Sequence, residues 1–382
     1  MVPGNFAQRA GALRYALSRT LCWLPGAEDA RCELEPKPAA ARATAGFPGA
    51  ERAIKLARMS VPGAVGCARL RAVESAVPEL PEVEVTRREL EPKLLGRSIA
   101  RIVTTRPSYF FLTKPDVLRR RLPGRSVLRL LRVGKYLLLE LDDASRLLLH
   151  LGMTGQLFFS GDPSVRLLSA LRGVSLSPEQ QSADRFVPDA HTHLVIDFED
   201  GGQSLYFRDV RKFGKVEWLA PGRASPRLDK LGVDALLATG RDLHAATGGR
   251  RVAIKTLLLD QSVLAGVGNI YADEALFLAR VHPQRSARRV QPAESDAIVA
   301  ALQRVMLRSI ETGGSSISDY VRPDGERGAY QDERQVYGRT AEPCHVCSTP
   351  IVRRVLGQRS SHFCPECQPR SAGASRARSK AR

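Results

Sequence analysis

The segment that decides the fold at one end of this chain reads Cys344-His345-Val346-Cys347 and, sixteen residues later, Cys364-Pro365-Glu366-Cys367. Each Cys-x2-Cys pair brings two thiolates to one tight turn, and the spacer has the length of a β-hairpin between two such turns. Four thiolates complete a closed tetrahedral site, so the pattern predicts one structural Zn²⁺ with no open position for catalysis. The alternative, two unrelated cysteine pairs, would leave a module this small without a source of folding energy.

The predicted hairpin is basic, with arginines in Val352-Arg353-Arg354 and in Gln358-Arg359-Ser360, a composition that favours phosphate binding. The whole chain is basic as well, because 58 Lys and Arg stand against 40 Asp and Glu, giving a net charge of +18. This charge indicates a polyanionic partner, nucleic acid above all, over the alternative of a solvated basic surface. No apolar run approaches the ~18–20 residues of a membrane span, so no membrane partner is expected.

The character of the sequence changes along its 382 residues, which exceed one ordinary domain of ~100–200 residues. Residues 1–77 are rich in Ala, Arg and Gly, show no motif, and are expected to be disordered or loosely helical. Their three cysteines, Cys22, Cys32 and Cys67, follow no pattern. Together with the metal-spaced set they fit a reducing, cytoplasmic compartment better than a disulfide framework.

Ordered elements are predicted from Pro78 onward. A helix should begin near Pro81 and stop at Gly96. The polar stretch Gly161–Pro188 is interpreted as a surface insertion. Many short strands and few helices indicate an antiparallel sandwich or barrel. Strands are expected at Ser126–Val133, Tyr136–Leu141, Arg146–Leu151, Gln156–Phe159, Leu194–Phe198 and Ser204–Phe207, with a hairpin turn at Glu199–Gly202.

After Pro221 the hydrophobic period becomes helical. One helix is predicted at Ile270–Ala279, entered through Gly266-Val267-Gly268-Asn269, and another from near Pro292 to Gly313-Gly314. The predicted fold class is therefore α+β, with an antiparallel β-sandwich and flanking helices, a helical domain and a zinc ribbon. The expected divisions are an extension (1–77), the sandwich (78–221), the helical domain (222–340), the zinc finger (341–369) and a basic tail (370–382).

Three separated motifs resemble the formamidopyrimidine-DNA glycosylase family and together span roughly residues 78–368. Pro78-Glu79-Leu80-Pro81-Glu82-Val83-Glu84 is similar to the start of these enzymes. Gly266-Val267-Gly268-Asn269-Ile270-Tyr271-Ala272 resembles their helix–two-turn–helix signature, and the segment 358–368 resembles their zinc-finger ending. Leu80, where the related endonuclease VIII enzymes have Gly, favours the branch that acts on oxidised purines.

The resemblance implies that Pro78 is the nucleophile. A free secondary amine can attack the anomeric carbon of the sugar, expel the base and form an iminium, which permits strand cleavage by β,δ-elimination. An α-amino group has a reference pKa of ~7.7–8.0, whereas an amide nitrogen offers no such lone pair. Glu79 matches the acid/base carboxylate of the family, and Lys135 matches a lysine directed at the damaged nucleotide. Without the resemblance, Glu79 would be an ordinary helix cap and Lys135 a solvated turn residue.

The resemblance also assigns DNA contacts. Met153, Arg211 and Phe213 match three residues that fill the space left when a base is extruded from the duplex, although core packing would explain Met and Phe equally well in isolation. The family has Pro where Val210 stands. The remaining assignments are Asn269 and Arg359 as a phosphate-gripping pair, Lys255 as a phosphate or lesion contact, and Thr312–Tyr320 as a loop that closes over the extruded base.

The expected function is therefore base-excision repair: a bifunctional glycosylase and AP lyase, acting as a bacterial, nucleoid-associated monomer on double-stranded DNA that contains 8-oxoguanine or formamidopyrimidines. One alternative is a catalytically silent protein that binds damaged DNA. A second is a glycosylase for oxidised pyrimidines of the endonuclease VIII branch, which Leu80 and Phe213 disfavour.

Pro78 can act only if residues 1–77 are absent. Val77 occupies the position of an initiator methionine, and a GTG codon can start translation in bacteria, so we expect residues 1–77 to be an over-extended gene start. The alternatives are a cleaved targeting segment and a retained segment that silences the site.

Overall fold

The structure is a computed structural model that describes residues 78–161, 188–316, 320, 322–324 and 326–370. The extension 1–77, almost all of the predicted insertion and all but the first residue of the basic tail lie outside these residues, as do three residues of the Thr312–Tyr320 loop. Among the described residues, no helix is long and apolar enough to cross a membrane.

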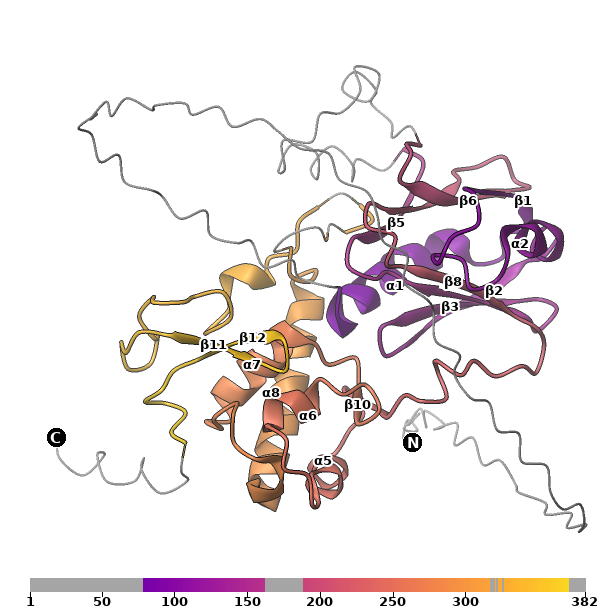
Figure 1. The fold of residues 1–382 in the computed structure, drawn as a ribbon. Helices are drawn as coiled ribbons and strands as arrows, with labels where there is room; N and C mark the ends of the chain where they lie inside the picture. Colours follow the sequence, from indigo (N-terminus) through magenta and orange to yellow (C-terminus); the bar gives the residue numbers. More distant parts are fainter. Residues whose placement is uncertain (1–77, 162–187, 317–319, 321, 325, 371–382) are drawn as a thin grey trace, which may run out of the picture. The chain divides into compact units, whose positions relative to one another are not determined.

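Two four-stranded antiparallel sheets form the first half of the described chain (Figure 1). Their facing side chains make one hydrophobic core, to which Leu139, Leu149, Phe159 and Phe207 contribute. The predicted antiparallel sandwich is thus confirmed. One sheet has the order β1 (Ile99–Thr104), β6 (Thr192–Phe198), β7 (Leu205–Asp209), β5 (Gly155–Phe159), and the other β2 (Val127–Val133), β3 (Tyr136–Leu141), β4 (Arg146–His150), β8 (Lys215–Leu219).

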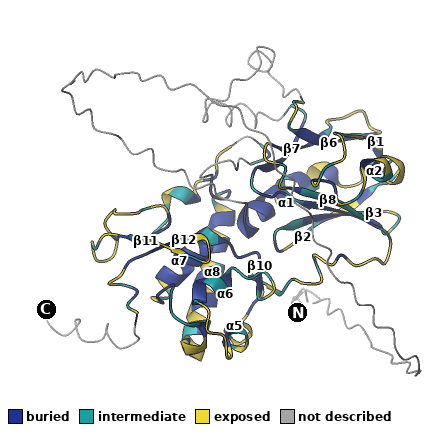
Figure 2. Cartoon of the chain, viewed as in Figure 1, coloured by how far each residue is buried: buried dark blue, intermediate teal, exposed yellow. Residues whose placement is uncertain are grey.

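Helices make up most of the second half of the chain and pack around a separate core. In this helical core the helix α7 (Asn269–Leu278) is almost wholly buried, as its dark blue colour in Figure 2 shows. In the same half of the chain, the short strands β9 (Val233–Asp234) and β10 (Leu264–Ala265) pair in parallel. The remaining elements are α2 (Pro115–Arg121) in the sandwich domain, and α5 (Gly240–Thr247), α6 (Ile254–Leu258), α7 (Asn269–Leu278), η1 (Ala287–Arg289), α8 (Pro292–Glu311) and η2 (Tyr330–Asp332) in the helical part.

Helix α1 (Leu80–Leu94) belongs to both cores. Val83, Leu90 and Leu94 pack into the sandwich, whereas Leu80 and Val85 pack into the helical core. Because apolar residues line two faces of one helix, the start of α1 is fixed between the two halves of the chain. Pro78 and Glu79 directly precede this helix and are buried.

The chain ends in an antiparallel hairpin of β11 (Val352–Leu356) and β12 (Arg359–Phe363), drawn in yellow in Figure 1. Gly357 and Gln358 form its two-residue turn, and both have positive φ angles, 53° and 63°. Two consecutive left-handed residues match the twist of the flanking strands, which is why this turn type suits a hairpin. The hairpin predicted between the cysteine pairs is confirmed.

Candidate active site

Glu79 is the N-cap residue of α1, and its carboxylate lies at the N-terminus of a second helix, α7. The backbone N–H of Ile270 donates to Glu79 Oε1 at 3.2 Å. Gly268, the N-cap of α7, permits this approach, because a Cβ there would lie 2.0 Å from Glu79 Cδ. Exposed N–H groups and the helix dipole favour a carboxylate at this position. Two helix N-termini therefore hold one acidic group.

The charge of Glu79 is set by burial and by two neighbours. The pKa of Glu79 is raised to about 7, above all by burial and also by Glu82, while Lys135 lowers it. A carboxyl group with a pKa near neutrality can both give and accept a proton at physiological pH. Its Oε2 has no hydrogen-bond partner among the described residues, so one oxygen remains available for a substrate atom.

Lys135 occupies the tip of the β2–β3 turn, next to Gly134 with φ 57°. Burial lowers the pKa of the Lys135 ammonium, Glu79 raises it, and Arg359 of the hairpin lowers it. Glu79 and Arg359, two predicted site residues that are far apart in the sequence, therefore both act electrostatically on Lys135. Arg132 supports the turn, because it donates to Gly134 O at 3.1 Å and pairs with Glu84 and Asp234 at 3.0 and 2.6 Å.

Glu82 is a buried carboxylate that sequence analysis treated only as part of a helix start. It accepts hydrogen bonds from the Glu79 N–H at 2.9 Å, the Tyr271 hydroxyl at 2.6 Å and the Ser315 N–H at 2.9 Å. Burial raises its pKa. The capping-box spacing Glu79-x-x-Glu82 was the available signal, but only the fold shows that this carboxylate also holds Ser315, which is 233 residues away.

Asn269 and Arg359, predicted as a pair, lie next to each other. Asn269 begins α7, and its Nδ2 donates to Ser360 Oγ at 3.2 Å, directly beside Arg359 in the hairpin. Arg359 is exposed and Asn269 is half-buried. The arrangement places an amide and a guanidinium at one surface, as a phosphate contact requires.

Lys255 does not lie at this surface. Its side chain is 1% exposed, and Nζ pairs with Asp273 of α7 at 2.8 Å and donates to the Ser360 carbonyl. Asp273 also accepts from the His362 N–H at 2.8 Å and from Ser361 Oγ at 3.1 Å. This buried pair joins β12 to α7. In the structure Lys255 therefore contacts the hairpin, whereas the sequence predicted a contact with a phosphate or with the lesion.

Met153, Arg211 and Phe213 lie on two loops of the sandwich domain. Met153 is half-buried between β4 and β5, and the other two are exposed between β7 and β8. The Arg211 guanidinium stacks 4.8 Å from the centre of the Phe213 ring. The exposed ring of Phe213 therefore does not fit core packing, which was the alternative explanation from the sequence.

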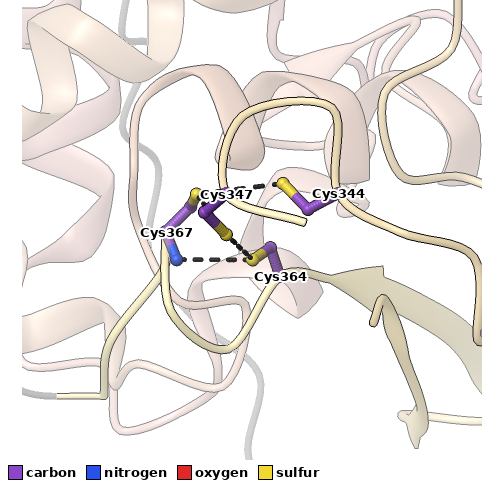
Figure 3. A group of neighbouring side chains, drawn as sticks. All are labelled: Cys344, Cys347, Cys364 and Cys367. Carbon is purple, nitrogen blue, oxygen red and sulfur yellow. Dashed lines mark hydrogen bonds between the residues drawn. The ribbon is translucent and has the colours of Figure 1, made fainter. Parts of the chain in front are cut away.

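The four cysteines converge on one point, as Figure 3 shows. Their sulfurs lie within 4.8 Å of one another, with 3.4 Å from Cys347 to Cys364 and 3.9 Å from Cys344 to Cys367. Tetrahedral zinc with Zn–S bonds of ~2.3 Å requires sulfurs about 3.8 Å apart, so this set fits the ion. Backbone N–H groups of Val346 and Cys367 donate to Cys344 and Cys364 sulfurs at 3.4 Å each, as expected around bound thiolates.

Two sheets with the buried acid Glu79 directly after Pro78, a helical domain and a four-cysteine hairpin are the combination expected of DNA glycosylases that use an amine nucleophile. Three family models match in order: the formamidopyrimidine-DNA glycosylase N-terminal domain at residues 77–216, its H2TH domain at 231–321, and a zinc finger found in FPG and IleRS at 341–370. The chain belongs to the formamidopyrimidine-DNA glycosylase family.

Relatives and solved structures agree with this membership. The formamidopyrimidine-DNA glycosylases of Solibacter usitatus and Cupriavidus pinatubonensis are 40% and 42% identical, and 77% and 76% of this chain covers all of each. The MutM (FPG) protein of Thermus thermophilus is 37% identical with a TM-score of 0.64, covering 77% of this chain and 100% of its own. MutM in complex with carbocyclic 8-oxo-G containing DNA is 32% identical, with a TM-score of 0.65 and coverages of 76% and 100%. The predicted family, fold class, enzyme class and zinc finger are confirmed.

Proposed function

We propose that this chain removes oxidised purines from duplex DNA and then cleaves the strand at the resulting abasic site. The observation that carries the proposal is the placement of Glu79: a buried carboxyl group with a pKa of about 7, next to the only amine position that the family chemistry uses, Pro78. An acid of this pKa beside a secondary amine suits a reaction that needs one proton donor and one neutral nucleophile.

In the proposed reaction the Pro78 nitrogen attacks the anomeric carbon, and the bond from that carbon to the base breaks with its electron pair leaving on the base. Glu79 donates a proton to the sugar ring oxygen, so that the ring opens and the iminium forms. Loss of a proton from C2′ then expels the 3′ phosphate, and loss of a second proton from C4′ of the conjugated iminium expels the 5′ phosphate. Lys135 lies within electrostatic reach of Glu79 and supplies positive charge beside the phosphates.

The proposed substrates are 8-oxoguanine and formamidopyrimidine lesions. Solved relatives include a Lactococcus lactis FPG complexed with Fapy-dG containing DNA and one complexed with abasic-site DNA. Leu80 and the exposed Phe213 favour the oxidised-purine branch over the oxidised-pyrimidine branch. Met153, Arg211 and Phe213 would fill the vacated space in the duplex, and Asn269 and Arg359 would hold the backbone.

Zn²⁺ would be held by Cys344, Cys347, Cys364 and Cys367 and would supply folding energy to the hairpin. The hairpin in turn presents Arg359 to Lys135. We further propose that the chain acts as a monomer on the chromosome in the bacterial cytoplasm, which the bacterial origin of the relatives supports.

We propose that the active form begins at Pro78, because an amide nitrogen cannot attack the sugar. The family model begins at residue 77, and 77% and 76% of this chain are enough to cover the two relatives named above over their entire length. We therefore propose that residues 1–77 are not part of the working enzyme.

The test is borohydride trapping on an 8-oxoguanine duplex, using a chain expressed with methionine directly before Pro78. Reduction of the iminium should give a covalent protein–DNA band, and peptide mapping should place the adduct on Pro78. A band mapped to a lysine would reject the proposed nucleophile, and the absence of a band would favour the silent DNA-binding alternative.

A further inference from the structure

Two loops of the sandwich domain carry the three residues assigned to the vacated duplex space. The first, Gly152–Thr154, connects β4 to β5 and bears Met153, while the second, Val210–Gly214, connects β7 to β8. Their backbones touch, since a Cβ at Gly152 would lie 2.5 Å from the Gly214 nitrogen. Loops on the surface are ordinarily mobile, so a wedge built from two of them needs an explicit restraint.

Asp209, the last residue of β7, supplies that restraint and is fully buried. Its Oδ2 accepts the Gly214 N–H at 2.7 Å, and its Oδ1 accepts the Arg211 N–H at 3.2 Å. Oδ1 also accepts the hydroxyl of Thr154 from the first loop. A single carboxylate thus binds both ends of one loop and the end of the other, and charge-assisted hydrogen bonds of this kind are about twice as strong as neutral ones.

Further contacts complete the same unit. Thr154 Oγ1 accepts the Arg211 N–H at 3.0 Å, so the threonine joins the carboxylate to the second loop. The Tyr109 hydroxyl donates to the Arg211 carbonyl at 3.0 Å, and His193 Nε2 donates to the Asp209 carbonyl at 2.9 Å.

We propose that Asp209 is a positioning residue that holds Met153, Arg211 and Phe213 together as one rigid wedge, without itself contacting DNA. The proposal rests on the proposed function, because the void-filling role of the three residues belongs to it. Preorganisation matters because a wedge that must first order its loops loses part of its insertion energy to conformational entropy.

The experiment measures insertion without catalysis. The full zinc-loaded chain is bound to a duplex that contains a tetrahydrofuran abasic-site analogue opposite 2-aminopurine, whose emission rises when the wedge unstacks it. The wild-type chain should raise the emission, and Phe213→Ala should abolish the rise. Asp209→Asn, which cannot accept the Gly214 N–H through its new NH₂ group, should lower the insertion equilibrium about tenfold while overall DNA affinity changes less. Asp197→Asn in β6 is the matched control, since that carboxylate serves neither loop.

A second pair of variants protects the test against misfolding of Asp209→Asn. Thr154→Val removes the hydroxyl that joins the two loops and should reproduce the loss, whereas Thr154→Ser should restore it. Full insertion by Asp209→Asn at an unchanged Tm would overturn the proposal. The proposal would also be overturned if Asp209→Asn and Thr154→Val lost emission and DNA affinity to the same extent as their Tm fell. Asp209 would then contribute only to the stability of the fold. No rise with the wild-type chain would reject the wedge itself.

This readout is separate from the proposed reaction. If the chain that begins at Pro78 fails to trap DNA with borohydride, the proposed function fails, yet an emission rise that depends on Asp209 would still support the positioning role.

Discussion

The zinc hairpin and the start of α1 are built in opposite ways. The four cysteines come from one segment, Cys344–Cys367, and their convergence follows from spacing alone. The raised pKa of Glu79 comes first from its burial, and it is lowered by Lys135 on another strand pair and by the N–H of Ile270, 191 residues away. The comparison shows that short spacings in the sequence can specify a metal centre. A shifted pKa, in contrast, depends on burial and on residues that only the tertiary structure brings together.

Helix α7 nevertheless connects the two regions. Its N-terminus holds Glu79, and further along it Asp273 accepts from β12 while Glu274 accepts the N–H groups of Gln335, Val336 and Tyr337 at 2.8 to 3.0 Å. One helix thus contacts both the acid Glu79 and the hairpin strand β12.

The largest effect should come from the residues before Pro78. Uncleaved full-length protein should give no borohydride adduct, because an amide nitrogen cannot form the iminium, while the chain that begins at Pro78 should give one. Mass spectrometry of both N-termini establishes which form is tested. If an uncleaved full-length chain still trapped DNA through Pro78, the requirement for a free amine at Pro78 would be disproved.

Loss of the metal should have the next largest effect. Cys364→Ser should abolish DNA binding, because the hairpin loses folding energy on the order of 10 kcal/mol while both hydrophobic cores remain. Metal analysis should find about one zinc per wild-type chain. Val346→Ala, an exposed change between two ligands, is the control and should leave zinc and binding intact. A zinc-free preparation with full activity would contradict the prediction.

Glu79→Gln should slow excision about 10²–10⁴-fold, the usual contribution of a general acid. It should also alter the pH profile. The reaction needs protonated Glu79, whose fraction falls as pH rises through about 7, and a neutral Pro78 amine, whose fraction rises through ~7.7–8.0. The wild-type rate should therefore peak between these values and decline on the alkaline side. Single-turnover rates of Glu79→Gln should show no alkaline decline, and a retained decline would assign that limb to another group.

Breaking the buried pair that joins the hairpin to α7 should cost stability. Lys255→Met leaves Asp273 charged and buried, so the free energy of unfolding should fall by about 3–5 kcal/mol. Arg308→Ala, which breaks an exposed and solvent-screened pair with Glu333, should leave the free energy of unfolding nearly unchanged and is the control. Denaturant titration measures both. An unchanged stability for Lys255→Met, with weaker DNA binding, would restore the direct DNA contact that the sequence suggested.

The smallest effect should be the loss of one phosphate contact. Arg359→Ala should weaken binding to damaged and undamaged duplexes alike, by about tenfold, and reduce the slope of log affinity against log salt by about 1. Asn269→Ala should act in the same direction. Arg120→Ala on α2 removes the same charge elsewhere and serves as the control. A changed lesion preference at unchanged affinity would show that Arg359 contacts the lesion and not the backbone.

Helices α1, α7 and α8 and most strands of the sandwich could be predicted from the sequence, whereas the short helices α2, α5 and α6 were not. Tyr136–Leu141 is β3 as expected, and the helix predicted from Pro292 ends at Glu311, two residues before Gly313. Strands β1, β8, β9 and β10 were not predicted. Lys215–Leu219, for example, is short, and only its pairing with β4 makes it a strand. Strand β7 extends to Asp209 and not to Phe207, because β5 supplies partners as far as Gly155.

What the sequence by itself determined is the zinc site and the order of the domains, because both rest on residue types at short spacings. The role of Pro78 stays a prediction that the family resemblance implies. Only the tertiary structure decided that Lys255 is a buried anchor, that Glu82 holds a distant loop, and that Asp209 joins two loops. The physical reason is the same in each case. Charge, burial and hydrogen-bond partners depend on groups that the chain brings together from far apart, and no local pattern specifies them.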